Sequence, residues 1–235
     1  MSFNKIIFQK NNRNVIFFQS YLFTFVADLG AMDKITKNII STAEQKFIQV
    51  GIRNVSIDDI CNELRISKKT FYKYYPQKEN LIVAILMNIG ERNAEKFKKI
   101  YQNKNAIDAL IQIIKELKKN EDNNPHVLMH DLQKYYPEIY SRFCDEKHKR
   151  IRINFEENLR KGIEEGYYRE DMDVEMVSYF HSIQLKNVFE EIQNLDTKMK
   201  GKRMMDFFID LIIRLITNEK GFEYIQNNLK DTNLA

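Results

Sequence analysis

The sequence has few residues that end helices and few that could cross-link the chain. Only 7 glycines and 3 prolines occur in 235 residues, which argues against a fold of many short strands joined by tight turns. Two cysteines, Cys61 and Cys144, are too few for a disulfide framework, which suits a reducing compartment and predicts a cytoplasmic location. Ile, Leu, Lys, Glu, Gln and Asn instead recur at helical spacing. These features predict an all-α fold of about nine helices.

Signatures of catalysis and metal binding are also missing. The sequence contains no glycine-rich phosphate loop, no His-Glu-x-x-His pair and no set of residues that would activate a nucleophile. His126 and His130 lie four residues apart and could share a metal, but no third ligand stands at convincing spacing, although Asp131 and His148 are conceivable. We therefore expect no enzymatic activity, no cofactor and no metal.

The first 31 residues differ from the rest of the chain. Basic residues precede an apolar run over 15–27, as in a signal peptide, but polar residues interrupt the run. It also falls short of the roughly 20 residues that a membrane-spanning helix needs. Three interpretations stay open: an upstream extension with the natural start at Met32, a membrane-anchoring segment, and a secretion signal. We prefer the first, and expect no membrane partner.

Capping signals divide residues 33–78 into three helices. The first helix carries an apolar residue at every fourth position: Ile35, Ile39, Ala43 and Phe47. Ser56 with Asp59 three residues later predicts a capping box at the start of the second helix. Ser67 then caps the third helix, which Pro76 ends because proline cannot continue it. The turn between the second and third helices is short enough to force a steep crossing, as in a helix-turn-helix.

The third helix separates apolar from polar side chains. Phe71 and Tyr75 lie four residues apart and should face inward. The outward set combines lysines, which neutralise phosphates or bond guanine edges, with hydroxyl-bearing side chains: Lys68, Lys69, Thr70, Tyr72, Lys73 and Tyr74. The segment Arg65–Lys78 holds five basic residues and no acidic one. A solvated face on an ordinary helical hairpin is the competing interpretation, but the outward tyrosines favour a helix that reads DNA.

The stretch from about Ile35 to Leu81 resembles the TetR family of bacterial transcriptional repressors. The resemblance is carried by Val-Ser-Ile-Asp-Asp-Ile-Cys at 55–61 and by Ile-Ser-Lys-Lys-Thr-Phe-Tyr-Lys-Tyr-Tyr-Pro-Gln-Lys-Glu-Asn-Leu at 66–81. It implies contacts to DNA from the second, third and fourth helices: Ser56, Ser67, Lys68, Lys69, Thr70, Tyr72, Lys73, Tyr74 and Lys78. By the same resemblance Ser56 and Lys78 would each bind a phosphate at the start of a helix.

Three positions depart from the family's pattern. Arg65 stands where the family commonly has glycine, so this turn must accept or avoid a left-handed backbone, and the side chain could add a phosphate contact in compensation. Lys69 replaces a small residue inside the recognition helix, which alters the surface that faces the groove. Gln77 replaces a serine cap and is expected to be a weaker one.

Six more helices are expected beyond Glu79, at roughly 78–102, 105–120, 126–135, 138–165, 173–194 and 201–219. Their number and order resemble the family's regulatory domain. The last two are apolar over too wide a face for a single core, which predicts a symmetric dimer joined by a four-helix bundle. Four residues are candidates to line an effector pocket, although a core role is the simpler interpretation for each: Met129, Phe143, Tyr179 and His181.

We therefore divide the chain into an N-terminal extension (1–32), a helix-turn-helix domain (33–78) and a ligand-binding and dimerisation domain (79–235). The predicted function is that of a DNA-binding regulator, a repressor, which binds palindromic double-stranded DNA as a homodimer and is released by an unidentified small-molecule effector. The alternative function is a membrane-associated helical protein, anchored through the apolar segment 15–27.

Overall fold

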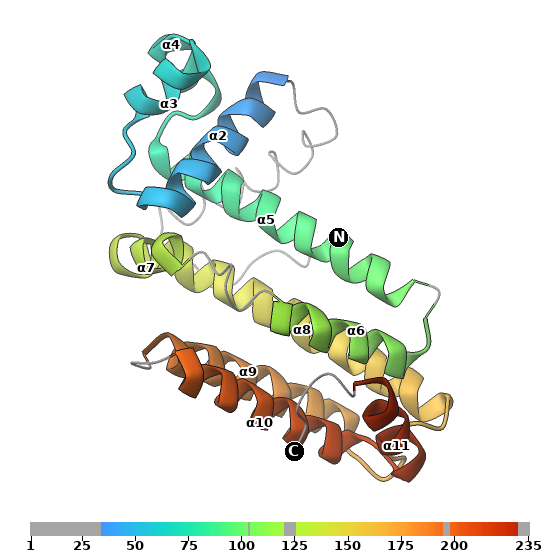
Figure 1. Cartoon of the computed structure of the whole chain (residues 1–235). Helices are drawn as coiled ribbons and strands as arrows, with labels where there is room; N and C mark the ends of the chain where they lie inside the picture. Colours follow the sequence, from blue (N-terminus) through green and yellow to red (C-terminus); the bar gives the residue numbers. More distant parts are fainter. Residues whose placement is uncertain (1–33, 103, 120–125, 195–197, 230–235) are drawn as a thin grey trace, which may run out of the picture.

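A computed structural model describes residues 34–102, 104–119, 126–194 and 198–229 and contains ten helices in these ranges (Figure 1). The predicted extension 1–32, with its apolar segment, lies outside them. The helices are α2 (Lys34–Val50), α3 (Ile57–Leu64), α4 (Lys68–Tyr74), α5 (Lys78–Tyr101), α6 (Ala106–Lys119), α7 (His126–Tyr135), α8 (Pro137–Glu164), α9 (Val174–Asn194), α10 (Lys198–Ile216) and α11 (Glu219–Asn228). The predicted all-α class, with a helix-turn-helix followed by a helical C-terminal domain, is confirmed.

The helix count differs from the prediction at the C-terminus. The predicted helix 201–219 ends at Ile216 as α10, and a separate short helix, α11, follows it. Asn218 caps α11 by accepting the Gly221 N–H at 2.9 Å. A Cβ on Gly221 would lie 2.1 Å from the Tyr167 carbonyl oxygen, so this glycine serves a close approach of two backbones inside a helix. No helix was predicted beyond residue 219, so α11 differs from the prediction.

The buried apolar side chains form two separate clusters. The first core lies under the helix-turn-helix and is built by α2, α3, α4, the first half of α5 and α7. The second core is built by α6, the C-terminal part of α8, and α9, α10 and α11. Figure 1 shows the helix-turn-helix at one end of the molecule and the α9–α10 pair at the other. The long helices α5 and α8 run between them.

The first core crosses the boundary predicted at residue 78. Leu81 and Ile82 of α5 are buried in it, and so are Leu128 and Leu132 of α7, which lie some fifty residues further along the chain. By its packing α7 therefore belongs to the helix-turn-helix, although the sequence analysis placed it in the ligand-binding domain. The division at residue 78 stays a prediction. The packing groups α7 and the start of α5 with the helix-turn-helix, so the two halves of the molecule do not correspond to two continuous segments of the chain.

The loop after α2 rests on α7. Gly51 has a left-handed backbone (φ 86°), and a Cβ there would lie 2.6 Å from a carboxylate oxygen of Asp131. The same oxygen accepts the N–H of Arg53 at 3.1 Å. The Arg53 guanidinium lies 4.6 Å from the centre of the Tyr135 ring, which adds a cation–π contact. Glycine is therefore required at 51 both for its backbone angle and for the space that Asp131 occupies.

An ion pair fixes α2 against α5. The Glu44 carboxylate is only 8% exposed and receives two hydrogen bonds from the guanidinium of Arg92, one of them 2.9 Å long. The Asn88 side chain adds a longer bond of 3.5 Å. A bidentate ion pair of this kind constrains the orientation of the two side chains as well as the distance between them. The angle between the first helix and the long connecting helix is therefore held by side chains at their crossing.

None of the helices in the described ranges has the length and apolar character needed to cross a membrane.

Candidate nucleic-acid interface

The second helix of the motif, α3, begins at the predicted capping box. The Ser56 hydroxyl accepts the Asp59 N–H at 3.1 Å, and the Asp59 carboxylate accepts the Ser56 N–H at 2.7 Å. The Ser56 hydroxyl also donates to this carboxylate at 2.7 Å, and this bond together with the one from the Ser56 N–H favours the charged form and lowers the pKa of Asp59. Ile60 and Cys61 face the core, where Cys61 acts as a small apolar residue.

The turn between α3 and α4 contains a left-handed residue. Arg65 has φ 53° and ψ 42°, and its N–H donates to the Asn62 carbonyl at 3.3 Å. The next N–H, of Ile66, donates to the Cys61 carbonyl at 3.0 Å. Arg65 therefore accepts the left-handed backbone that glycine commonly adopts at such a helix end.

The recognition helix α4 is short and is held by its own cap and by two buried rings. Ser67 accepts the Thr70 N–H at 3.0 Å, and the two hydroxyls lie 2.8 Å apart. Phe71 and Tyr75 are fully buried with ring centres 5.9 Å apart, which confirms that they face inward. A helix of seven residues is not stable alone, so these contacts determine its orientation.

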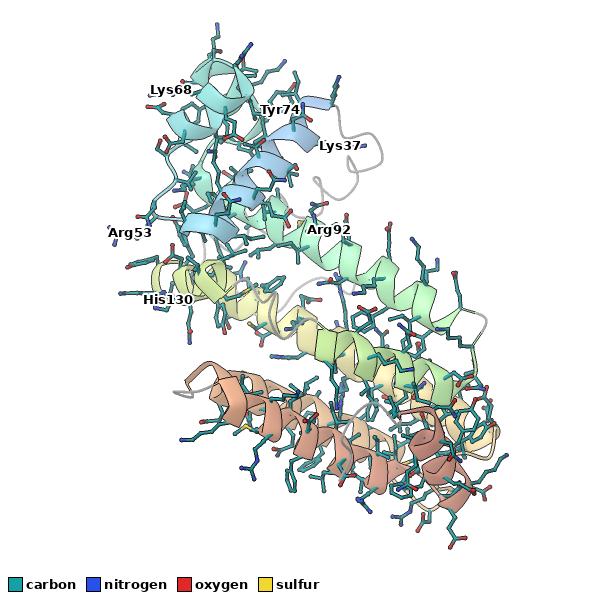
Figure 2. All side chains as sticks on the ribbon, viewed as in Figure 1. Lys37, Arg53, Lys68, Tyr74, Arg92 and His130 are labelled. Atoms are coloured by element: carbon teal, nitrogen blue, oxygen red, sulfur yellow. The ribbon has the colours of Figure 1, made fainter. Side chains whose placement is uncertain are left out.

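The opposite face of α4 is open to solvent. Lys69 and Lys73 are exposed, and Tyr72 is 47% exposed although its ring packs edge-on against Phe71 at 5.6 Å. Tyr74 is half-buried and packs against the first core, so only part of it is available to a partner. Figure 2 shows Lys68 and Tyr74 at the end of the molecule formed by α3 and α4. The structure thus places the predicted residues of α4 on one small, exposed, basic surface.

Two of the predicted DNA-binding lysines have partners within the protein. The Lys68 ammonium pairs with Asp58 of α3 at 2.7 Å, and this contact raises the pKa of Lys68. The Lys78 ammonium points inward and donates to the carbonyls of Ile52 at 2.6 Å and Val55 at 2.5 Å. It also lies 5.6 Å from the centre of the Phe47 ring, and burial lowers its pKa. Lys78 thus ties the start of α5 to the loop that precedes α3.

Sequence reasoning missed these partners. Asp58 lies ten residues before Lys68, and Ile52 lies twenty-six residues before Lys78, so no local spacing signals either contact. The predicted weak cap at Gln77 is compensated by the other half of a capping box. The Asn80 side chain accepts the Gln77 N–H at 3.0 Å, while Gln77 itself makes no side-chain cap.

The other candidate sites do not assemble. His130 is exposed beside Asp131, and within the described ranges no group of three His, Cys, Asp or Glu side chains could hold a metal ion. Met129 and Phe143 pack against the first core, whereas His181 is stacked on Phe155 near the second. The structure therefore does not bring the four candidate pocket residues together.

Comparisons with known proteins agree with this geometry. Residues 39–85 match the family described as "Bacterial regulatory proteins, tetR family". The uncharacterised HTH-type transcriptional regulator YuxN of Bacillus subtilis is 44% identical over 50 residues, which are 21% of this chain and only 17% of that protein. The HTH-type transcriptional repressor KstR2 of Mycobacterium tuberculosis is 21% identical over 155 residues, 64% of this chain and 78% of that protein.

The whole described fold is also shared. A TetR transcription regulator from Haloarcula marismortui superimposes with a TM-score of 0.66 at 19% identity, covering 77% of this chain and 98% of that structure. The sequence match covers the helix-turn-helix, and the structural match extends over the regulatory helices. Together with the presentation of α4, these findings identify the chain as a member of the TetR family and a DNA-binding transcriptional regulator.

Proposed function

We propose that this regulator is a repressor that places α4 in the major groove of a palindromic operator. The observation that carries the proposal is the division of α4 into a buried aromatic face and an exposed basic face, on a helix that its cap and core hold in place. Lys69, Tyr72 and Lys73 are the residues best placed to meet base edges and phosphates. KstR2, which aligns over most of its length, is itself named a repressor.

The remaining predicted contacts take supporting roles in this proposal. Ser56, Ser67 and Thr70 are exposed or half-exposed at the two caps. The Ser56 hydroxyl already donates to the Asp59 carboxylate, so it donates to a phosphate only after releasing that bond, whereas one proton of the Ser67–Thr70 hydroxyl pair stays available to a phosphate. Lys68 meets DNA only if it leaves Asp58 or shares its charge with it. Tyr74 contributes its exposed part, and Lys78 acts by holding α5 against the loop before α3 unless its ammonium is released from the two carbonyls.

A homodimer formed through α9 and α10 would supply the two reading helices that a palindrome needs. Both helices leave large apolar side chains uncovered in the described structure: Met176, Tyr179, Phe180, Ile183, Phe207 and Leu211. Phe207 is 70% exposed, an unfavourable position for phenylalanine in a monomer. Two such faces packed symmetrically would form a four-helix bundle and set the recognition helices about one turn of DNA apart, roughly 34–36 Å.

A small-molecule effector is proposed to bind the regulatory half. His181 lies between Phe155 and Phe208, with ring centres 3.9 and 5.7 Å away. Its Nδ1 atom is buried without a hydrogen-bond partner in the described part of the chain. A buried polar atom of this kind is costly unless something binds to it, so this region is where we expect the effector. An effector releases DNA if it binds the non-binding arrangement of the two halves more tightly.

Both cysteines are free thiols, which agrees with the proposed cytoplasmic location.

The proposal is tested by selecting the DNA that the purified protein retains from sheared genomic DNA of its source, then measuring affinity for the enriched fragment. Replacing Tyr72 and Lys73 together by alanine should abolish specific binding and leave the helical circular dichroism unchanged. Unaltered binding by the double variant would remove α4 from the interface. Replacing Phe207 and Leu211 together by glutamate should halve the mass measured by light scattering if α10 forms the dimer.

A further inference from the structure

The turn before the recognition helix holds a strained arginine. Arg65 is the one residue other than glycine with a positive φ angle in the described ranges. In this conformation the Cβ of an L-residue crowds the neighbouring carbonyl, whereas glycine adopts it freely. The hydrogen bonds at this turn come from backbone atoms, so a glycine here would make the same bonds. The fold alone therefore gives no reason for an arginine.

The Arg65 side chain also has no use within the described part of the chain. It is exposed, and none of the acidic residues described there pairs with it. Two other basic residues of the same domain are paired, because Lys46 contacts Glu63 at 2.5 Å and Lys68 contacts Asp58, whereas Arg65 shares its exposed position with Lys69 and Lys73 of α4. Arg65 is a cation at a strained backbone position that forms no ion pair with the described acidic residues. Such a backbone outlier is a starting point from which a function can be inferred.

Its position identifies the partner. Arg65 stands two residues before Ser67, the cap of α4, and consecutive Cα atoms are about 3.8 Å apart, so the two residues lie within about 8 Å. A DNA strand that runs past the start of α4 comes within reach of a long arginine side chain. The planar guanidinium matches a phosphate with two parallel N–H donors and stays charged at any physiological pH.

We propose that Arg65 binds a backbone phosphate beside the groove that α4 reads. The inference rests on the proposed placement of α4 and adds to it a contact from outside the recognition helix. It accounts for both observations, since the phosphate contact offsets the strain only when DNA is bound. Arg65 then contributes affinity for any duplex and carries no information about base sequence.

The test uses the opposite effects that Arg65→Gly should have on folding and on binding. The full-length variant should be more stable than the parent, with its melting temperature higher by about 2 °C or more, because the left-handed strain is gone. Its affinity for a labelled duplex of about 30 base pairs and arbitrary sequence should fall roughly fivefold to tenfold. The slope of log affinity against log salt should become shallower by about one for each bound protomer.

Two further variants separate charge from strain. Arg65→Lys keeps the cation and the strained backbone, so it should retain most of the affinity and the salt slope. Lys99→Ala removes an exposed cation near the far end of α5 and should leave the salt slope unchanged. A variant Arg65→Gly that gains stability but keeps the parent's salt slope would overturn the inference. So would an Arg65→Lys variant as weak as Arg65→Gly.

The outcome remains distinct from that of the proposed function. If replacing Tyr72 and Lys73 by alanine abolishes specific binding while Arg65→Gly changes nothing, the recognition helix stands and only the phosphate contact fails. If the double variant binds as the parent does, the placement of α4 itself fails, and the contact proposed for Arg65 fails with it.

Discussion

The two cores of this protein are built differently. In the first core every helix contributes apolar side chains that are buried almost completely, and the charged residues Glu44 and Lys46 are paired with Arg92 and Glu63. The second core buries polar groups in its interior. Asn158 donates to the Ala106 carbonyl at 2.8 Å, and the Tyr168 hydroxyl donates to the side-chain oxygen of Asn158 at 3.1 Å. The second core also lies next to an uncovered apolar face and contains His181, whose buried Nδ1 atom has no hydrogen-bond partner among the described residues.

This difference corresponds to what each half has to do. A half that presents a short helix in one orientation needs dense apolar packing, because any looseness moves the reading surface. A half that binds a ligand and a second subunit needs polar groups inside and apolar groups outside, each at a cost in stability of the monomer. The first core is therefore expected to be rigid, and the second to respond to its surroundings.

The largest expected effect tests whether α7 belongs to the first core. Leu132→Ala removes a fully buried side chain of α7 and should cost about 3 kcal/mol of unfolding free energy. Hydrogen exchange should show lost protection in α3 and α4, far away in sequence, before any loss in α10. Val127→Ala, at an exposed position of the same helix, should change stability by under about 0.5 kcal/mol. Loss of protection confined to α9 and α10 would contradict the assignment of α7.

A smaller effect should distinguish the second core by its pH dependence. Burial lowers the pKa of His181 to about 4, whereas an unfolded histidine titrates near 6.5. The unfolded chain thus binds the proton more tightly, so stability is complete above pH 6.5 and falls as the pH drops towards 4. At pH 5 the loss from this residue is roughly 2 kcal/mol.

His181→Phe keeps the aromatic stack and removes the titrating group. Between pH 7 and pH 5 the unfolding free energy of this variant, measured with urea, should fall by roughly 2 kcal/mol less than that of the parent. A parent whose pH profile is matched by the variant would show that the His181 proton does not matter to folding. A shift in the pKa when an effector is added would in addition locate the ligand beside His181.

The smallest effect concerns the crossing of α2 and α5. Arg92→Ala leaves the buried Glu44 carboxylate without its main partner and should cost about 1–2 kcal/mol, since Arg92 itself is half exposed. Arg92→Lys keeps a positive charge near Glu44 and should therefore lose less unfolding free energy than Arg92→Ala. Because the contact sets an angle, DNA affinity should fall further than the stability loss alone explains. Equal affinity in the presence of lower stability would show that the pair only strengthens the fold.

The sequence allowed prediction of features that depend on neighbours along the chain. The two caps at Ser56 and Ser67 and the inward rings of Phe71 and Tyr75 follow from residues within four positions of one another. Such spacings are fixed by helix geometry and by the chemistry of helix ends, so they can be read directly. At Arg65 the sequence left open whether the turn would accept a left-handed backbone, and the structure shows that it does.

Features that depend on distant contacts could not be predicted in this way. The inward turn of Lys78 requires the carbonyls of a loop that another helix positions, and the pairing of Lys68 requires the crossing angle of α3 and α4. The docking of α7 onto Gly51 joins residues eighty positions apart. α11 was not predicted, and it depends on distant contacts as well, because its Gly221 packs against the Tyr167 carbonyl more than fifty residues away.

The membership of α7 in the first core has a consequence for protein engineering. Residues 33–78 read as a portable module, yet their interior is completed by Leu81, Leu128 and Leu132. A chimera that joins this segment to a foreign regulatory domain would leave an open apolar seam where α7 belongs. Transferring the helix-turn-helix domain therefore requires two separate segments of the chain, residues 33–78 with the start of α5, and α7.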